Sequence, residues 1–385
     1  MKSSPQRARE IEAVMRLQCL PGVGTRTLWR ILTRFGSGVG ALDAPSPRLN
    51  EAARSATAAA GLRARELGER VERALKRCAA SDIRVLTWKD SGYPDRLFQL
   101  TDPPPLLFYH GRPELLSAPA VTIVGSRRST EYGRRVAERL AAELSGRGVV
   151  VVSGLALGID GAAHRGALES GGDTIAVLGS GVDLIQPSAH RALGKRIARD
   201  GLLISEFLPG EPAQAHHFPR RNRILAALGL AVVVVEAGER SGAFITVEHA
   251  LDLGRDVHAV PGPVDSPQSR GCNALLQQGA HVVTSAHDFA RALELPDAVA
   301  GEGDANRGAR AVAGSPGVTA PNGEPGRMTP TARLVWRALG ERPVRIEELT
   351  QSTRLDSGRV LAALTEMEVA GWVSREAGMR FRKAS

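Results

Sequence analysis

Short apolar runs rich in valine, isoleucine and leucine alternate with amphipathic segments between residues 120 and 290. Each run is continuously apolar, which is typical of strands buried on both faces of a parallel sheet. The alternation therefore predicts an α/β fold with an open, doubly wound, mostly parallel sheet. Seven strands are predicted, beginning near residues 120, 148, 173, 202, 231, 256 and 280. Six helices fit between and after them, at about 132–146, 160–170, 188–200, 219–228, 242–254 and 271–278.

We place this sheet in a domain over residues 86–295. Three further regions of the chain precede or follow that domain. Residues 1–85 have helical spacing, including a long stretch over 50–80, and predict a small helical N-terminal domain. Residues 296–326 are rich in glycine, alanine and proline and predict a flexible linker. Residues 327–385 show three short helical patterns and a final two-strand pattern, which predict a winged helix.

Composition excludes several classes of protein. The chain is 43% hydrophobic and 24% charged, as globular proteins are, and its three cysteines lie far apart, which speaks against a disulfide framework or a CxxC zinc site. No apolar run has the length of a membrane helix, and the N-terminus lacks the apolar part of a secretory signal. We therefore expect a soluble, cytoplasmic protein. The net charge of +9 is compatible with a nucleic-acid partner but is weak evidence alone.

Glycine, serine and arginine follow the ends of several predicted strands. The segment Gly125-Ser126-Arg127 follows the first strand, Gly154 the second, and Ser241-Gly242 the fifth. The carboxyl ends of parallel strands meet at one edge of the sheet, where helix N-termini offer N–H groups to anions. These loops therefore predict a phosphate-binding edge. Neither the GxGxxG fingerprint nor a lysine-containing P-loop is present, so no dinucleotide or nucleoside triphosphate cofactor is expected.

The densest basic cluster is Arg220-Arg221-Asn222-Arg223, at the start of a predicted helix. The helix dipole disfavours cations at this end, so the cluster suggests an external polyanion that binds the arginines. The alternative is that they pair with internal carboxylates such as Glu206 or Glu236. His164 lies on a helix face without a triad motif around it, and a structural role is the better hypothesis.

Catalytic and base-stacking signatures are weak. GxSxG and HExxH are absent, and aromatic residues make up only 4% of the chain, so phosphate contacts should dominate over stacking. Residues 20–27 resemble a helix-hairpin-helix turn, for which DNA contact and plain helix packing remain equally open. The third helix of the winged-helix segment carries Glu366 and Glu368, which favours protein contact or a structural role over a major groove.

Taken together, these residues resemble the DNA-processing protein A family, called DprA or Smf. The resemblance covers nearly the whole chain, and its most specific marks are IVGSRRSTEYG, VVSGLALGID, TIAVLGSGVD, FPRRNRI, SGAFIT and GRDVHAVPG. Two departures occur: Gln186 and His190 stand where the family usually has tyrosine and asparagine, and Phe244 stands in place of a smaller leucine.

The resemblance implies an extended Rossmann-like central domain that binds single-stranded DNA, dimerises and loads the strand onto the recombinase RecA during natural transformation. The family is not known as an enzyme, and no cofactor or metal is implied. The implied DNA-binding residues are Gly125, Ser126, Arg127, Gly154, Arg221, Asn222, Arg223, Ser241 and Gly242, to which we add Arg191, which follows the departure at His190.

Two other classes of function remain as alternatives. One is a nucleotide-processing hydrolase of the lysine-decarboxylase-like class, with Arg223 and Glu248 as its arginine and glutamate, although the glycine-rich loop of those enzymes is missing. The other is an interaction protein whose working part is the winged helix. That hypothesis leaves the arginine cluster unexplained.

Overall fold

The structure is a computed structural model that describes residues 4–293, 330–339, 344–353, 355, 357–369, 372–376 and 380–383. The chain divides into two units, Met1–Gly303 and Asp304–Ser385, which are described separately. The predicted linker over 296–326 lies outside the described residues. The predicted domain boundaries stay predictions.

A nine-stranded sheet forms the centre of the first unit, with the strand order β1-β2-β6-β5-β4-β3-β7-β8-β9. The doubly wound, mostly parallel sheet is confirmed, and the seven predicted strands are β3 (Ala120–Val124), β4 (Val150–Ser153), β5 (Thr174–Val177), β6 (Leu202–Ser205), β7 (Ala231–Val234), β8 (Asp256–Ala259) and β9 (His281–Val282). Two strands fall outside the prediction: β1 (Arg84–Thr87) and β2 (Leu106–Gly111). They pair antiparallel at one end of the sheet. β1 is only partly buried, whereas β2 begins with the buried run Leu106-Leu107-Phe108, an apolar signature that the prediction missed.

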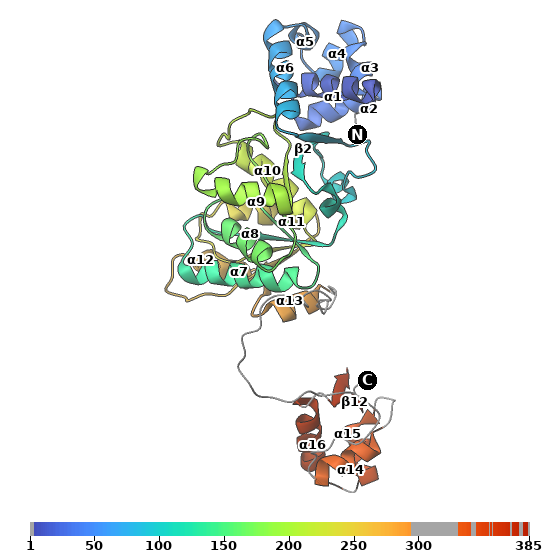
Figure 1. Cartoon of the computed structure of the whole chain (residues 1–385), viewed down its shortest axis with the longest axis vertical. Coiled ribbons are helices and arrows are strands. Elements are labelled where there is room, and N and C mark those ends of the chain that lie inside the picture. The colour runs from blue at the N-terminus through green and yellow to red at the C-terminus, as the bar shows by residue number, and fades with distance from the viewer. Residues whose placement is uncertain are drawn as a thin grey trace, which may run out of the picture. The chain divides into compact units, whose positions relative to one another are not determined.

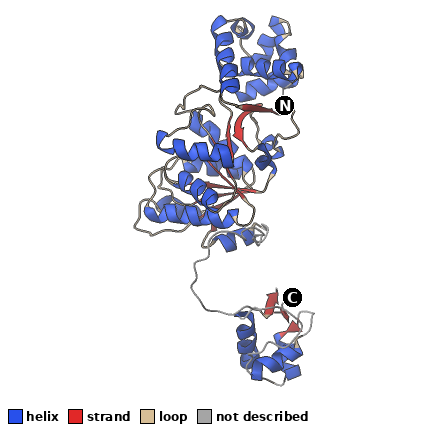
Figure 2. Cartoon of the chain, viewed as in Figure 1, coloured by secondary structure: helices blue, strands red, loops and turns tan. Residues whose placement is uncertain are grey.

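Helices cover both faces of the sheet (Figures 1 and 2). One face carries α7 (Glu131–Ser145), α8 (Ile159–Glu169), α9 (Arg191–Asp200) and α13 (Ala286–Ala292). The other carries α10 (His217–Leu228), α11 (Ala243–Asp252), α12 (Arg270–Gln277) and the short 3₁₀ helices η1 (Asp95–Gln99) and η2 (Pro113–Ser117). A further 3₁₀ turn, η3 (Ser188–His190), leads into α9. In β4, Val151 packs against the first set of helices while Val150 and Val152 pack against the second, which explains the continuous apolar run.

Six helices form the N-terminal bundle, which lies next to β2 in Figure 1. They are α1 (Pro5–Gln18), α2 (Thr25–Phe35), α3 (Gly38–Leu42), α4 (Ser46–Ala53), α5 (Ala58–Leu62) and α6 (Arg65–Ala80). The expected helical stretch over 50–80 is broken into pieces, since Arg54 takes a left-handed conformation, with φ of 52°, at the end of α4. The bundle is joined to the sheet by Gln18, whose Nε2 donates to the Glu206 carbonyl at 2.8 Å, and by an Arg7–Asp90 ion pair at 2.8 Å.

The second unit contains three helices and a small sheet. The helices are α14 (Pro330–Ala338), α15 (Ile346–Thr353) and α16 (Ser357–Val369). The strands β10 (Val344–Arg345), β11 (Val373–Glu376) and β12 (Arg380–Lys383) pair in the order β10-β12-β11. Leu349, Val360 and Phe381 lie in its core. The predicted winged helix is confirmed, with β10 as an additional strand.

Close packing between α7 and α8 leads to the first prediction. Gly166 of α8 lies against the backbone of Glu138 in α7, and a Cβ there would collide with that backbone. Gly166→Ala should therefore lower the free energy of unfolding by about 1–3 kcal/mol, because a backbone cannot move aside cheaply. Thermal or urea unfolding of the purified chain measures this.

Gly68→Ala in α6 is the matched control. The nearest atoms to a Cβ at Gly68 belong to the Arg16 guanidinium, at 3.9 Å, and an alanine in a helix is favoured over glycine. This variant should be neutral or slightly more stable than the wild type. Equal stability of the Gly166 and Gly68 variants would contradict the described packing.

Candidate functional site

The strand order reverses between β3 and β7, and a cleft opens beyond the carboxyl ends of the strands there. Open α/β sheets bind ligands at this kind of switch point. The cleft has a volume of about 660 Å³. Its walls are the segment after β3, the start of α8, the first turns of α10 and the segment between β7 and α11. The N-termini of α10 and α11 therefore direct the positive ends of their dipoles at the cleft.

Three exposed arginines line this cleft: Arg127, Arg128 and Arg240. Within the part of the chain that the structure describes, no carboxylate lies at ion-pair distance from any of them. The Arg127 guanidinium lies over the Phe218 ring, 4.8 Å from its centroid, which holds it at the cleft by a cation–π interaction. Unpaired cations around a concave surface attract a polyanion.

Arg221 also reaches the cleft, but its guanidinium is buried. It donates to the backbone carbonyls of Gly154 (2.7 Å) and Val177, at the carboxyl ends of β4 and β5. A Cβ at Gly154 would overlap this guanidinium, so glycine is required there. Burial lowers the pKa of Arg221 to about 10, and the charge remains at neutral pH. Arg221 therefore ties the start of α10 to two strand ends.

Asp160 lies near Arg221 at the base of the same cleft. Its Oδ2 accepts from the backbone N–H groups of Gly154 (3.1 Å) and Ala156 (3.3 Å). These bonds span Leu155, a buried residue in the left-handed region with φ of 56°. Burial raises the pKa of Asp160, while Arg221 and the two N–H groups oppose that rise. Asp160 thus fixes a strained loop at the cleft.

Arg223 points away from the cleft into a buried ion pair. Its Nη2 lies 2.7 Å from Oε2 of Glu206, which also accepts from Arg220 at 3.0 Å. The side chains of Arg223 and Glu206 are only 5% and 2% exposed. For Arg220 and Arg223 the pairing with Glu206 that the sequence left open is present, and DNA binding by Arg223 stays a prediction. The Glu206 carboxylate, which directly follows β6, thus compensates the positive charge of arginines at the positive end of the α10 dipole.

Most, but not all, of the predicted site residues line the cleft. Gly125, Ser126, Asn222, Ser241 and Gly242 line it, together with Arg127 and Arg221, whereas Gly154, Arg191 and Arg223 do not. The Asn222 amide bridges the two helix starts, since its Oδ1 accepts from Arg221 (3.1 Å) and its Nδ2 donates to the Gly242 carbonyl (3.4 Å). Arg191 is exposed at the first residue of α9, and its role stays a prediction.

The segment after β3 is held in place by Glu236, at the end of β7. Its carbonyl accepts from the Ser126 N–H at 2.6 Å. Its buried carboxylate accepts from the Thr130 N–H and hydroxyl, both at 2.7 Å. These three bonds fix the backbone that carries Arg127 and Arg128.

Sequence reasoning missed Arg128, Arg240 and Phe218 as cleft residues. Arg128 and Arg240 are direct neighbours of predicted site residues, but sequence alone does not show which arginines lack a carboxylate. His164 has the structural role expected for it: it is fully buried, and its Nδ1 lies 2.7 Å from the Thr174 hydroxyl. Burial lowers its pKa to about 3.

The geometry gives little support to other chemistries. Among the described residues, no group of three or more histidine, cysteine, aspartate or glutamate side chains is placed to bind a metal. Arg223, which the hydrolase hypothesis needs, is paired with Glu206, while Glu248 is an exposed residue of α11. None of the described helices is both long and apolar enough to cross a membrane.

Comparisons with known proteins agree with the motifs. Residues 84–294 match the family of DNA recombination-mediator protein A, and residues 319–379 match the DprA winged helix domain. Protein Smf of Synechocystis is 36% identical over 318 residues, which cover 78% of this chain and 80% of that protein. DNA processing protein DprA of Streptococcus pneumoniae is 46% identical over 206 residues, 54% of this chain and 73% of that protein.

Solved structures are similar as well. The X-ray structure of Streptococcus pneumoniae DprA has a TM-score of 0.64 and 34% identity, covering 76% of this chain and 98% of that one. DNA processing protein A of Helicobacter pylori has a TM-score of 0.51 and 31% identity, covering 56% and 97%, and its structure is described for its single-stranded DNA binding mode. With more than half of its length matched by the first family, the chain belongs to the DNA processing protein A (DprA/Smf) family.

Proposed function

We propose that this chain binds single-stranded DNA in the cleft between the ends of β3 and β7. The observation that carries the proposal is the set of three exposed arginines without carboxylate partners, Arg127, Arg128 and Arg240. Two helix N-termini point at the same cleft and add favourable potential for phosphate. The single-stranded DNA binding mode described for the Helicobacter pylori relative supports a single strand as the ligand.

The predicted site residues, together with Arg128 and Arg240, divide into two roles in this proposal. Arg127, Arg128 and Arg240 bind phosphates, and Ser126, Asn222, Ser241 and Gly242 contact the strand along the walls, where Gly125 leaves room for it. Gly154, Arg221 and Arg223 shape the site from below, since Arg221 and Arg223 donate their hydrogen bonds to protein atoms. Arg191 would extend the path of the strand toward α9.

The biological role that we propose is recombination mediation rather than catalysis. The family is described as DNA recombination mediators, which supports the proposal that the chain, as a homodimer in the cytoplasm, transfers incoming single strands to RecA during natural transformation. The chain should then shorten the lag of RecA filament assembly on a strand coated with single-strand-binding protein. Assembly kinetics that do not change on adding the chain would contradict this role.

The direct test of DNA binding uses Arg127 and salt. Each phosphate neutralised on a single strand contributes about 0.7 to the slope of log affinity against log salt. Arg127→Ala should flatten that slope by about 0.7 and weaken binding about ten- to a hundredfold, the value of a charge-assisted hydrogen bond of about 1.5–3 kcal/mol. Fluorescence anisotropy with a labelled oligonucleotide at several salt concentrations measures both quantities.

Two variants accompany this test. Arg127→Lys should recover the slope better than the affinity, because lysine keeps the charge but loses the guanidinium plane that lies over Phe218. Arg63→Ala, which removes an exposed arginine of the N-terminal bundle, should leave both quantities unchanged. Unchanged affinity and slope in a folded Arg127→Ala protein would show that the strand binds elsewhere.

Arg223 should behave differently from Arg127. Arg223→Ala leaves the buried Glu206 carboxylate with Arg220 alone, and breaking a buried pair costs about 3–5 kcal/mol of stability. The protein that remains folded should keep the wild-type salt slope. The double variant Glu206→Gln/Arg223→Met should regain part of the stability, since it removes the fully buried charge pair together. The regain is incomplete because Arg220 loses Glu206 and Asp102, which lies 3.5 Å from Arg223 Nε, loses its arginine. Normal stability with a flattened slope would instead make Arg223 a phosphate ligand.

A further inference from the structure

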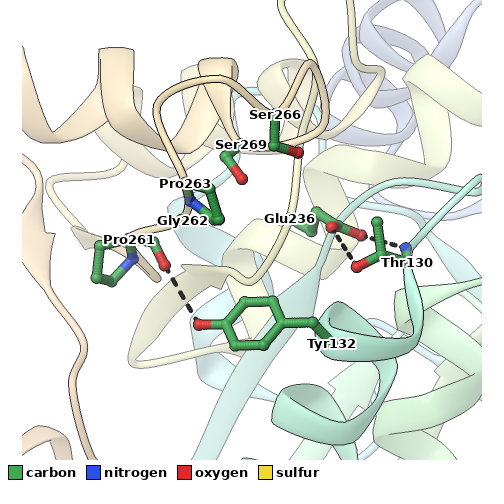
Figure 3. A pocket seen from close by; sticks show the side chains of 8 residues that line it. All are labelled: Thr130, Tyr132, Glu236, Pro261, Gly262, Pro263, Ser266 and Ser269. Atoms are coloured by element: carbon green, nitrogen blue, oxygen red, sulfur yellow. Dashed lines mark hydrogen bonds between the residues drawn. The ribbon is translucent and has the colours of Figure 1, made fainter.

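A second cavity of about 600 Å³ adjoins the cleft. The same two chain segments line both hollows. Residues 124–128 and 238–243 face the cleft, whereas Thr130, Tyr132 and Glu236 face the second cavity. The loop after β8 closes its other side with Pro261, Gly262, Pro263, Ser266 and Ser269 (Figure 3).

The chemistry of this cavity differs from that of the cleft. Glu236 is the one charged residue among the eight that line it, and none of them is basic. Both oxygens of the Glu236 carboxylate already accept hydrogen bonds from Thr130. A phosphate would therefore be repelled. Proline rings and serine hydroxyls form the opposite wall, which suits a neutral, flat group with polar edges.

Tyr132 gives this cavity an aromatic face. Of the aromatic side chains in the chain, only Tyr132 (43% exposed) and Phe98 (47% exposed) are largely exposed, and all of them lie among the described residues. Phe98 packs on Tyr93, with ring centroids 5.0 Å apart, and lines neither the cleft nor the second cavity. The Tyr132 hydroxyl donates to the Pro261 carbonyl at 3.3 Å, which holds its ring along the cavity (Figure 3).

We propose that this cavity holds a nucleobase of the bound strand, stacked on Tyr132. The proposal rests on the proposed binding of single-stranded DNA in the adjoining cleft. Tyr132 lies four residues after Arg128 on the segment that lines both hollows, so we expect a strand whose phosphates bind the arginines to bring a base to the ring. The Ser266 hydroxyl donates to Gln268 Oε1 at 3.3 Å and keeps its acceptor capacity for a donor on the base edge, whereas Ser269 is buried. Stacking on an aromatic ring is tolerant of sequence.

Two probes separate this base site from the phosphate site. One is a mixed-sequence oligonucleotide, and the other has the same backbone but abasic sites throughout. The wild type should bind the mixed sequence more tightly, and Tyr132→Ala should weaken that binding about 5- to 100-fold. Tyr132→Ala should bind the abasic strand as tightly as the wild type does, because that strand has no base to stack. The salt slopes for both strands should also stay unchanged, because a stacked base releases no counterions.

Matched variants separate the loss of the aromatic ring from other effects of the substitution. Tyr132→Phe should retain binding, since the ring remains, whereas Tyr132→Leu should lose it while filling the space. Phe98→Ala, at the other exposed aromatic residue, should leave both probes unaffected. Irradiating an oligonucleotide that contains 5-iodouracil should cross-link it to the peptide that carries Tyr132 in the wild type.

Three outcomes would overturn the base site: equal wild-type affinity for both probes, equal loss for both in Tyr132→Ala, or a cross-link confined to other peptides. Each of these leaves the phosphate cleft intact as long as the abasic strand binds with a steep salt slope. If neither probe binds the wild type at all, the proposed function itself is wrong, and the base site fails with it.

Discussion

The hydrogen bonds that Glu236 accepts from the segment after β3 fix the position of the chain segment that lines both the cleft and the second cavity. They join the first strand of the doubly wound half to the strand where the order reverses, through Ser126 at 2.6 Å and Thr130 at 2.7 Å. Because the segment between these anchors carries Arg127 and Arg128, the exposed cations owe their position to a buried carboxylate. The negative charge of Glu236 is therefore compatible with the proposed DNA binding nearby, since its carboxylate oxygens already accept hydrogen bonds from Thr130.

Arginine serves two purposes at this edge of the sheet, and burial separates them. Arg221 donates to two backbone carbonyls and Arg223 donates one hydrogen bond to Glu206, and their loss would leave these acceptors without that partner. Arg127, Arg128 and Arg240 are exposed and have no such partners among the described residues. Glu206 connects the buried set to the N-terminal bundle, since its carbonyl accepts from Gln18. Glu206 thus contacts both the N-terminal bundle, through Gln18, and α10, the start of which lines the cleft.

The fold was largely predictable, and the site only in part. Continuous apolar runs such as the one over 149–152 have few solutions other than a strand buried on both faces, so the parallel sheet followed from sequence. The antiparallel strands β1 and β2 did not follow from the sequence prediction. The half-buried β1 lacks that signature, whereas β2 has a short buried apolar run, directly after three prolines, that the prediction missed. At the site, the motifs identified the loops that line the cleft. They could not show that Arg223 faces Glu206 while Arg128 faces the cleft, because pairing between distant residues is decided by the packed structure.

Amide hydrogen exchange, measured with and without excess single-stranded oligonucleotide, tests the central claim that the strand lies across the ends of β3 and β7. Binding should slow exchange in peptides covering 125–130, 217–223 and 238–243, because these segments form the walls of the cleft. Peptides of α6, on the N-terminal bundle, should exchange at unchanged rates. Protection confined to the winged helix, or no protection at the cleft under saturating oligonucleotide, would contradict the account.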